Sequence, residues 1–436
     1  MKSTERTNFR WLVMLLIISL VIINYIDRSA IGYAIGPISK SLGIKPAQWG
    51  LVSAAFSVGY FLVAFISGPM VDHYGTKKVL GVSIVVWSLA SMLTAVASTF
   101  LTIFVARVIL GIGEGPGFPA ASRATSRWMP KNEQGFVLSL IGGVGVAGSI
   151  LISGPIVTQL IPHVGWRVTF IILGALGLLW TLAWVIIFSD DPALHKQLNP
   201  AELAYISDGK TDEERSPVKS KIELRKVLAN KSLLAIAFGF FSWGYIFWGL
   251  LYWLPGYLSA TYGLDIKSVG LFSSLPWAAG VVGALAGGLM LKKLYLVTQR
   301  LYLRCVVMAF FVLLAGMCMI PVFLIHSLTV AVTFISLGVG FGFVTAGFWW
   351  VASIETSPDQ PGLAAGLVDA SFAASGIATP IIMGYTVEYT GSFDGGFLTM
   401  MVIAVAGSLA MVVFTRGAGA EKCSALEVAR VSRTRG

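Results

Sequence analysis

The sequence predicts an all-α membrane protein with twelve transmembrane helices in two six-helix bundles. Composition is the first reason: 56% of the 436 residues are hydrophobic and only 12% are charged, about half the charged fraction of an ordinary soluble chain. The second reason is a series of apolar runs near the ~20 residues that a helix needs to cross a bilayer. The third is one long polar interval, which separates these runs into two groups of six.

The predicted spans begin with an apolar run at Trp11, which continues through the polar residues 24–28 to Tyr33. A basic start followed by a short apolar run also fits a cleaved signal peptide, but the many further spans favour an uncleaved helix. The remaining spans are predicted at 49–71, 79–97, 101–124, 135–160, 168–188, 232–258, 269–291, 301–325, 328–352, 362–387 and 393–414.

These spans divide the chain into an N-terminal bundle (1–188), a central loop (189–231), a C-terminal bundle (232–415) and a tail (416–436). The central loop holds eight acidic and eight basic residues. Twelve crossings place both chain ends and the central loop on one side of the membrane. The loops of the other side hold only four basic residues: Lys40, Lys45, Arg167 and Lys267. Because basic loops stay in the cytoplasm, both termini are predicted to be cytoplasmic.

Several function classes do not fit this sequence. The net charge of +10 follows the membrane orientation, so no nucleic-acid partner is expected. The cysteines are scattered and the four histidines fall in loops, which predicts no metal site and no cofactor. There is no nucleotide-binding loop and no Ser-His-Asp arrangement, so neither an enzyme nor an ATP-driven pump is expected.

Two pairs of charged residues lie inside predicted spans, where a charge is costly and usually faces a pathway. Asp27 and Arg28 interrupt the first span. Arg107, Gly111 and Glu114 lie in the fourth span at i, i+4 and i+7, and this spacing places them on one face of a helix. The sequence therefore predicts a transporter whose polar centre is built from these two sites.

The predicted loop after the second span carries a motif that reads GPMVDHYGTKK over residues 68–78. Gly75 suits a tight turn, and Asp72 is placed to pair with a cation or a helix end as part of a gate. With the topology of six and six helices, this loop resembles the signature loop of the major facilitator superfamily, in which a cation usually stands at the position of His73. The resemblance implies two six-helix bundles that enclose a midplane site, with alternating access by rocking of the halves.

Two further motifs narrow the resemblance: NYIDR at 24–28 and RVILGIGEGPGFP at 107–119. Together they resemble the anion:cation symporter family, and within it the bacterial proton symporters for galactonate, hexuronates and glucarate. The resemblance implies a monomer in a bacterial inner membrane that takes up an organic acid anion, first of all a hexonate or hexuronate, with protons. It also implies that Tyr25, Tyr60 and Trp350 contact the substrate. Packing is the alternative role for these three aromatic residues.

The four intramembrane charges have separate expected roles. Asp27 and Glu114 are the predicted proton sites, because burial and a nearby guanidinium act on the pKa of a carboxyl group in opposite directions and leave it able to load and release a proton. A purely structural ion pair is the alternative. Arg28 is the predicted anion ligand, since a guanidinium fork binds a carboxylate through two hydrogen bonds. Arg107 either binds substrate too or forms a structural or gating pair with Asp27 or Glu114.

Departures from the sugar-acid pattern lie mainly in the second half of the chain. Asp369, a predicted substrate contact, stands where these relatives carry asparagine, and it either donates a hydrogen bond when protonated or repels an acid when ionised. Val146 and Phe240 stand where the galactonate pattern has glutamine. Fewer amide partners for hydroxyl groups leave an aromatic or less hydroxylated carboxylate as an alternative substrate. The span 232–258 also carries aromatic residues that face either the site or lipid: Trp243, Tyr245, Trp248 and Tyr252.

Three other functions remain as alternatives. Organophosphate antiporters of the same family use an arginine in the seventh helix, but 232–258 contains no Lys or Arg. A drug-efflux carrier fits Gly154-Pro155 only in part, because the glycine pair that follows in that motif is missing. A sensor that binds ligand without moving it is the third. Sodium also remains an alternative to protons as the coupling ion, since carboxylates serve either.

Overall fold

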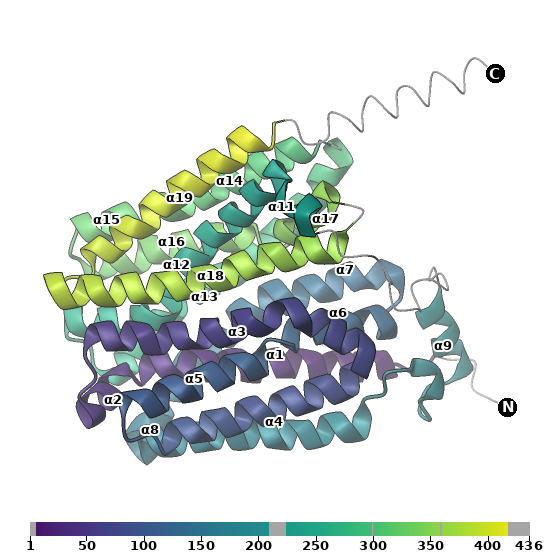
Figure 1. Cartoon of the computed structure of the whole chain (residues 1–436), viewed down its shortest axis with the longest axis horizontal. Helices are drawn as coiled ribbons and strands as arrows, with labels where there is room; N and C mark the ends of the chain where they lie inside the picture. Colours follow the sequence, from purple (N-terminus) through teal and green to yellow (C-terminus); the bar gives the residue numbers. More distant parts are fainter. Residues whose placement is uncertain (1–5, 209–223, 299, 358–359, 417–436) are drawn as a thin grey trace.

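The computed structural model describes residues 6–208, 224–298, 300–357 and 360–416, and these residues form helices and no strands. Most long helices lie side by side, with the first half of the chain on one side of the molecule and the second half on the other (Figure 1). The helices of the first half are α1 (Phe9–Tyr33), α2 (Ile35–Leu42), α3 (Pro46–Tyr74), α4 (Thr76–Ala95), α5 (Phe100–Glu114), α6 (Gly117–Trp128), α7 (Lys131–Ser139), the π-helical turn η1 (Leu140–Gly145) and α8 (Val146–Ile187). The central region contains the 3-10 turn η2 (Pro192–Leu194), α9 (Pro200–Ser207) and α11 (Leu224–Leu228). The second half contains α12 (Lys231–Tyr262), α13 (Ile266–Val297), α14 (Leu301–Met317), α15 (Met319–Leu324), α16 (Leu328–Val344), α17 (Phe348–Thr356), α18 (Pro361–Thr390) and α19 (Asp394–Phe414).

The predicted fold class is confirmed. Eleven helical segments of the described chain are long and apolar enough to cross a membrane. One of them, Lys131–Ile187, has 57 residues, far more than the ~20 that one crossing needs. At Gly165 its backbone leaves helical geometry with a φ of 78°, a conformation that glycine adopts without steric cost. This break separates the fifth and sixth crossings, which gives twelve.

Several crossings are interrupted where the sequence analysis expected one continuous helix. The fourth crossing is divided into α5 and α6 around Gly115 and Pro116, because proline has no N–H to continue the hydrogen-bond ladder. The short helix α2, of eight residues, follows the first crossing directly, and the sequence did not predict it. These interruptions change the local course of the chain and leave the order of crossings unchanged.

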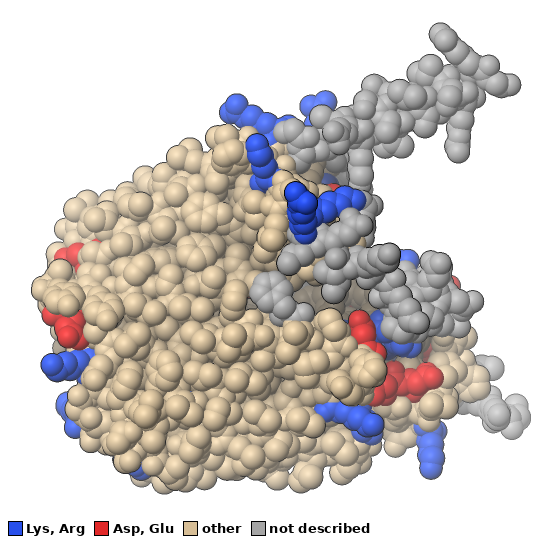
Figure 2. All heavy atoms as spheres, in the orientation of Figure 1, with Lys and Arg blue, Asp and Glu red and all other residues tan. Residues whose placement is uncertain are grey.

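The surface agrees with a membrane environment. Figure 2 shows a broad band without Lys, Arg, Asp or Glu between two ends where charged side chains gather. Large apolar side chains such as Leu62, Leu179 and Leu289 are exposed on the helices. In water this would be costly, whereas lipid tails accept such a surface.

The two halves meet along three helix pairs: α3 with α18, α8 with α13, and α1 with α12. The start of α1 and the end of α19 lie at one end of the molecule, together with α9 (Figure 1). We call this the terminal end and the opposite one the distal end. At the distal end the backbone N–H of Ala47 donates a hydrogen bond of 2.8 Å to the Glu388 carboxylate. This bond joins α3 to α18 and therefore connects the halves.

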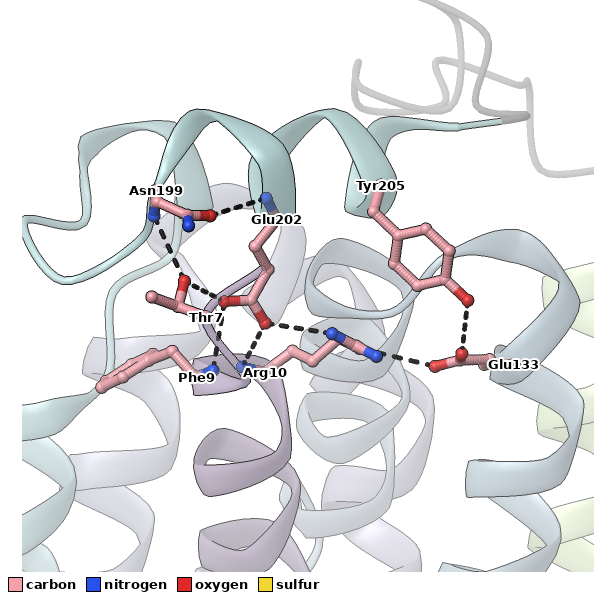
Figure 3. Close-up of polar contacts among 7 residues, drawn as sticks. All are labelled: Thr7, Phe9, Arg10, Glu133, Asn199, Glu202 and Tyr205. Atoms are coloured by element: carbon pink, nitrogen blue, oxygen red, sulfur yellow. Dashed lines mark hydrogen bonds and ion pairs between the residues drawn. The ribbon is translucent and has the colours of Figure 1, made fainter. Parts of the chain in front are cut away.

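Part of the central loop is fastened to the first half at the terminal end (Figure 3). The fully buried Glu202 carboxylate of α9 accepts hydrogen bonds from the backbone N–H groups of Phe9 and Arg10, each at 3.1 Å. The Arg10 guanidinium donates to the same carboxylate at 3.2 Å and lies 3.5 Å from Glu133 of α7. The Tyr205 hydroxyl donates to Glu133 at 2.7 Å. A carboxylate from α9 thus caps the N-terminus of α1, where helix N–H groups lack partners.

Candidate substrate and proton site

The centre of the first half holds a direct ion pair between Arg28 of α1 and Glu114 of α5. One Glu114 carboxylate oxygen accepts hydrogen bonds from Arg28 Nε at 3.0 Å and from Nη2 at 2.6 Å. Nη2 also donates to the Asn24 side-chain oxygen at 3.2 Å. Both charged side chains are buried. Arg28 and Glu114 are therefore brought together, whereas the sequence analysis considered Arg107 as the partner of Glu114.

Close packing of α3 on α5 builds the wall beside this pair. A Cβ atom added at Gly111 would lie 2.0 Å from the Phe56 carbonyl oxygen, so only glycine allows this approach. The approach brings Phe56 of α3 beside the guanidinium carbon of Arg28, 4.7 Å from the ring centroid. Tyr25 and Trp248 lie 4.4 and 5.5 Å from that carbon. Aromatic faces attract a cation and exclude water from it.

A cavity lies against the ion pair. It is small and is lined by Leu20, Val21, Asn24, Arg28, Trp87, Glu114, Gly117, Phe118 and Ala121. These residues all belong to the first half. Arg28, Glu114 and Asn24 supply its charged and amide groups, and the rest of its wall is apolar. Such a combination of apolar walls and few polar groups is typical of small-molecule sites.

Asp27 points away from its neighbour Arg28. Its Oδ1 atom accepts a hydrogen bond of 2.8 Å from the Ser91 hydroxyl of α4. The other oxygen, Oδ2, is buried and has no hydrogen-bond partner among the described residues. Successive residues of a helix point about 100° apart, which explains why the two adjacent charges occupy different interfaces. The two predicted proton sites therefore have different surroundings.

Arg107 lies at the boundary between the halves. Its Nη2 atom donates a 3.5 Å hydrogen bond to the Tyr252 hydroxyl of α12, and its guanidinium carbon lies 5.1 Å from the Phe56 ring centroid. Among the described residues it contacts no carboxylate within ion-pair distance. The direct pair with Asp27 or Glu114 that the sequence analysis considered is absent from this part of the structure.

Two of the other predicted contacts lie near Arg28. Tyr60 is buried with its ring centroid 5.6 Å from the guanidinium carbon. Asp369 of α18 is half-buried and lies within electrostatic reach of Arg28, Tyr25 and Tyr60. It therefore lies near the centre on the side of the second half.

Trp350 is farther away and reaches the centre through other rings. Its ring centroid lies 6.0 Å from that of Phe240, which stacks on Phe372 at 4.7 Å. Phe372 lies 5.4 Å from Trp248, the residue that covers Arg28. A continuous series of aromatic contacts thus lines the second half. Trp350 is half-buried at its far end.

Several residues of this centre were not selected from the sequence as site residues, among them Ser91, Trp248 and Tyr252. From the sequence, Trp248 and Tyr252 face either the site or lipid. In the structure both are buried, and their rings stack with centroids 5.6 Å apart. Trp243 and Tyr245 are buried as well. Ser91 carried no sequence signal, because a single serine in an apolar helix is common. Only packing shows that it meets Asp27.

The loop motif lies at the terminal end, away from the central cavity. The Asp72 carboxylate forms an ion pair of 3.3 Å with Arg123 of α6, in accord with the expected pairing to a cation. Gly75 makes the expected turn with a φ of 85°. The backbone N–H of Lys77 donates a 3.0 Å hydrogen bond to Asp190. This contact joins the start of α4 to the chain just after α8.

Comparisons with known proteins place this architecture in a family. Residues 17–366 match the model of the Major Facilitator Superfamily. The chain is 34% identical to the probable sulfoacetate transporter of Cupriavidus necator, over 93% of this chain and 94% of that protein. It is 32% identical to the hexuronate transporter of Bacillus subtilis, over 91% and 92% of the two chains. It is 27% identical to the probable galactarate/D-glucarate transporter of Escherichia coli, over 94% of each.

A solved structure supports the same fold. A bacterial homologue of the human lysosomal transporter Spinster, in an inward-facing and unoccupied conformation, superposes with a TM-score of 0.69. The sequences are 17% identical, and the match covers 94% of this chain and 96% of that one. These relatives are transporters rather than enzymes. The chain therefore belongs to the Major Facilitator Superfamily and is a multi-pass membrane transporter, as its loop motif and its topology predicted.

Proposed function

We propose that this transporter takes up an organic carboxylate anion together with protons, and that a sugar acid such as a hexonate or hexuronate is the first candidate substrate. The observation that carries the proposal is the buried pair of Arg28 and Glu114 beside the central cavity. The names of relatives that transport hexuronate or galactarate and D-glucarate support the substrate class. Both termini are proposed to be cytoplasmic.

Competition for Arg28 supplies the coupling. While Glu114 is ionised, its carboxylate occupies the guanidinium fork. A proton taken up by Glu114 removes that charge, and the fork becomes available to the substrate carboxylate. Asp27 is the second proton site and acts through its separate interface with α4. Rocking of the halves along α3 and α18 then exposes the loaded site to the other side of the membrane.

A less hydroxylated carboxylate is the second candidate substrate, and one observation favours it. The wall of the second half consists of Trp248, Phe372 and Phe240, and the indole N–H of Trp248 already donates to the Phe372 carbonyl at 3.0 Å. A polyhydroxylated substrate finds few free partners there, and each unpaired buried hydroxyl costs about 1–3 kcal/mol.

Uptake into proteoliposomes under an imposed pH gradient tests the proposal. Glu114→Gln is expected to abolish proton-driven accumulation and to leave some exchange, because the amide mimics the protonated carboxyl group. Asp208→Asn, which changes an exposed carboxylate at the end of α9, is the control and should accumulate normally. Full accumulation by the Glu114 variant would refute the coupling. Uptake driven by a sodium gradient instead of a pH gradient would indicate sodium as the coupling ion. Movement of the substrate out of the vesicles would indicate an efflux carrier. Binding of the substrate without accumulation would indicate a sensor.

A further inference from the structure

Arg107 differs from the other buried arginines of the described chain. Four arginines are buried there: Arg10, Arg28, Arg107 and Arg304. Arg10 and Arg28 each form an ion pair with a glutamate, and Arg304 contacts Glu355. Arg107 is 1% exposed, and its Nε atom has no hydrogen-bond partner among the described residues. Its single described hydrogen bond, to Tyr252, is long.

A buried guanidinium without a carboxylate in contact is unusual. Arginine stays protonated in proteins, so it cannot relieve the cost of burial by losing its charge. Asp27 and Glu114 act on Arg107 electrostatically, but from beyond contact distance. Asp369 acts on Arg28. Once Asp27 and Glu114 take up protons, the electrostatic compensation that these two carboxylates give Arg107 is lost as well.

We propose that Arg107 binds a second acid group of the substrate, so that within the proposed class of organic acids a compact diacid is preferred to a monoacid such as a hexonate or hexuronate. This inference rests on the proposed proton-coupled uptake. One acid group binds Arg28 and the other binds Arg107. The guanidinium carbons of the two arginines lie 4.7 and 5.1 Å from the same Phe56 ring centroid, so they are separated by no more than the sum of these distances. This upper limit is short enough for the two acid groups of one small molecule to reach both arginines.

The boundary between the halves provides access to Arg107. Arg107 belongs to α5 of the first half, whereas Tyr252 belongs to α12 of the second. When the halves move apart, the Tyr252 hydroxyl leaves Arg107. In the present structure the Tyr252 oxygen occupies the place that an oxygen of a substrate acid group would take. A hydroxyl is replaced by a carboxylate or sulfonate oxygen, which is the stronger partner for a cation.

The charges that cross the membrane follow from this arrangement. Protons on Asp27 and Glu114 and two negative charges on the substrate sum to zero, so diacid uptake is electroneutral. A monoacid carried with the same two protons would move one positive charge. The charge state of Asp369 does not change this balance, because its charge stays with the protein.

Matched acids that share a carbon skeleton test the inference without any need for transport. Thermal stabilisation of the purified transporter is measured with glucarate against gluconate and with succinate against butyrate. We expect the diacid of at least one pair to bind about tenfold more tightly or better, as a second desolvated charge pair supplies roughly 1.4 kcal/mol or more. Equal binding within both pairs, or no stabilisation by any of the four acids, would overturn the inference.

Variants assign the preference to Arg107. Arg107→Gln is expected to reduce the ratio of diacid to monoacid affinity to about one, and Arg107→Lys should retain part of it because the charge remains. Arg167→Gln removes an exposed arginine outside the centre and should leave the ratio unchanged. A diacid preference that persists in Arg107→Gln would contradict the assignment.

Uptake by the unaltered protein keeps the test independent of folding of the variants. A potassium diffusion potential that makes the vesicle interior negative should leave pH-driven uptake of glucarate unchanged. The same potential should accelerate any uptake of gluconate, because one positive charge enters with it. Acceleration of both acids to the same extent would count against the inference. If the acids bind with the expected preference but none is accumulated under a pH gradient, the proposed symport fails and the binding assignment stands.

Discussion

At the scale of single residues, the chemistry of this transporter depends on which carboxylate meets which arginine. Arg28 and Glu114 are 86 residues apart in the chain, yet they form the direct pair, while the adjacent Asp27 bonds to Ser91 instead. The aromatic faces of Tyr25, Phe56 and Trp248 cover the pair. They lower the local dielectric, which strengthens each interaction between charges.

Arg28→Lys tests whether the guanidinium fork itself recognises the substrate. Lysine keeps the positive charge but cannot offer two parallel hydrogen bonds to a carboxylate. We expect substrate affinity to fall about tenfold to a hundredfold. The circular dichroism spectrum should be unchanged, which would show that the fold is retained. Concentration dependence of uptake measures this change. An affinity equal to that of the unaltered protein would show that Arg28 does not bind the acid group through its fork.

At the scale of helices, the structural role of α9 is the one that was least predictable from the sequence. From the sequence alone, residues 199–206 belong to the polar central loop. In the structure, Glu202 caps α1 and pairs with Arg10, and Tyr205 reaches Glu133 of α7 (Figure 3). The cap fixes the start of the helix that carries Asp27 and Arg28. Part of the central loop therefore packs as a folded extension of the first half.

Glu202→Gln is expected to destabilise the first half. The substitution keeps the size of the side chain but leaves the buried Arg10 without this charge partner, which costs about 3 kcal/mol. A melting temperature several degrees lower in detergent is the expected result, with the preference among substrate acids retained. The exposed Asp208→Asn on the same segment is the matched control. An unchanged melting temperature for Glu202→Gln would mean that the cap does not stabilise α1.

At the scale of the whole molecule, function requires the two halves to change their contact. Their described contacts include the Ala47 and Glu388 bond at the distal end. A Cβ added at Gly50 would lie 2.4 Å from the Pro380 carbonyl oxygen, so α3 and α18 pack with their backbones close together. The halves are thus tightly joined at the distal end. The distal end can open only when α3 and α18 move apart.

Cross-linking tests this movement. In a protein whose native cysteines are replaced by serine, Ala47→Cys and Glu388→Cys are joined by a short bifunctional thiol reagent. The bridge should block accumulation almost completely, because the distal end can no longer open, and each single-cysteine variant should be unaffected by the reagent. Undiminished uptake by the bridged protein would argue against alternating access through this end.

The sequence by itself determined the membrane class, the order of the crossings and the family. These follow from local properties: apolar runs of the length of a bilayer and short motifs such as the loop 68–78. It also identified Asp27, Arg28, Arg107 and Glu114 as unusual, because an intramembrane charge is conspicuous against an apolar background. Which of these charged residues pair with each other could not be predicted from the sequence.

Only the tertiary structure decided which charges meet. Helix periodicity places Arg107 and Glu114 on one face of their helix, but it does not specify which neighbouring helix that face contacts. Packing of α3 and α5 at Gly111 and the position of α12 bring Arg28 to Glu114 and Tyr252 to Arg107. Contacts between residues far apart in the chain depend on how side chains of several helices fit together. For that reason the helices could be predicted from the sequence, whereas the partner of each buried charge could not.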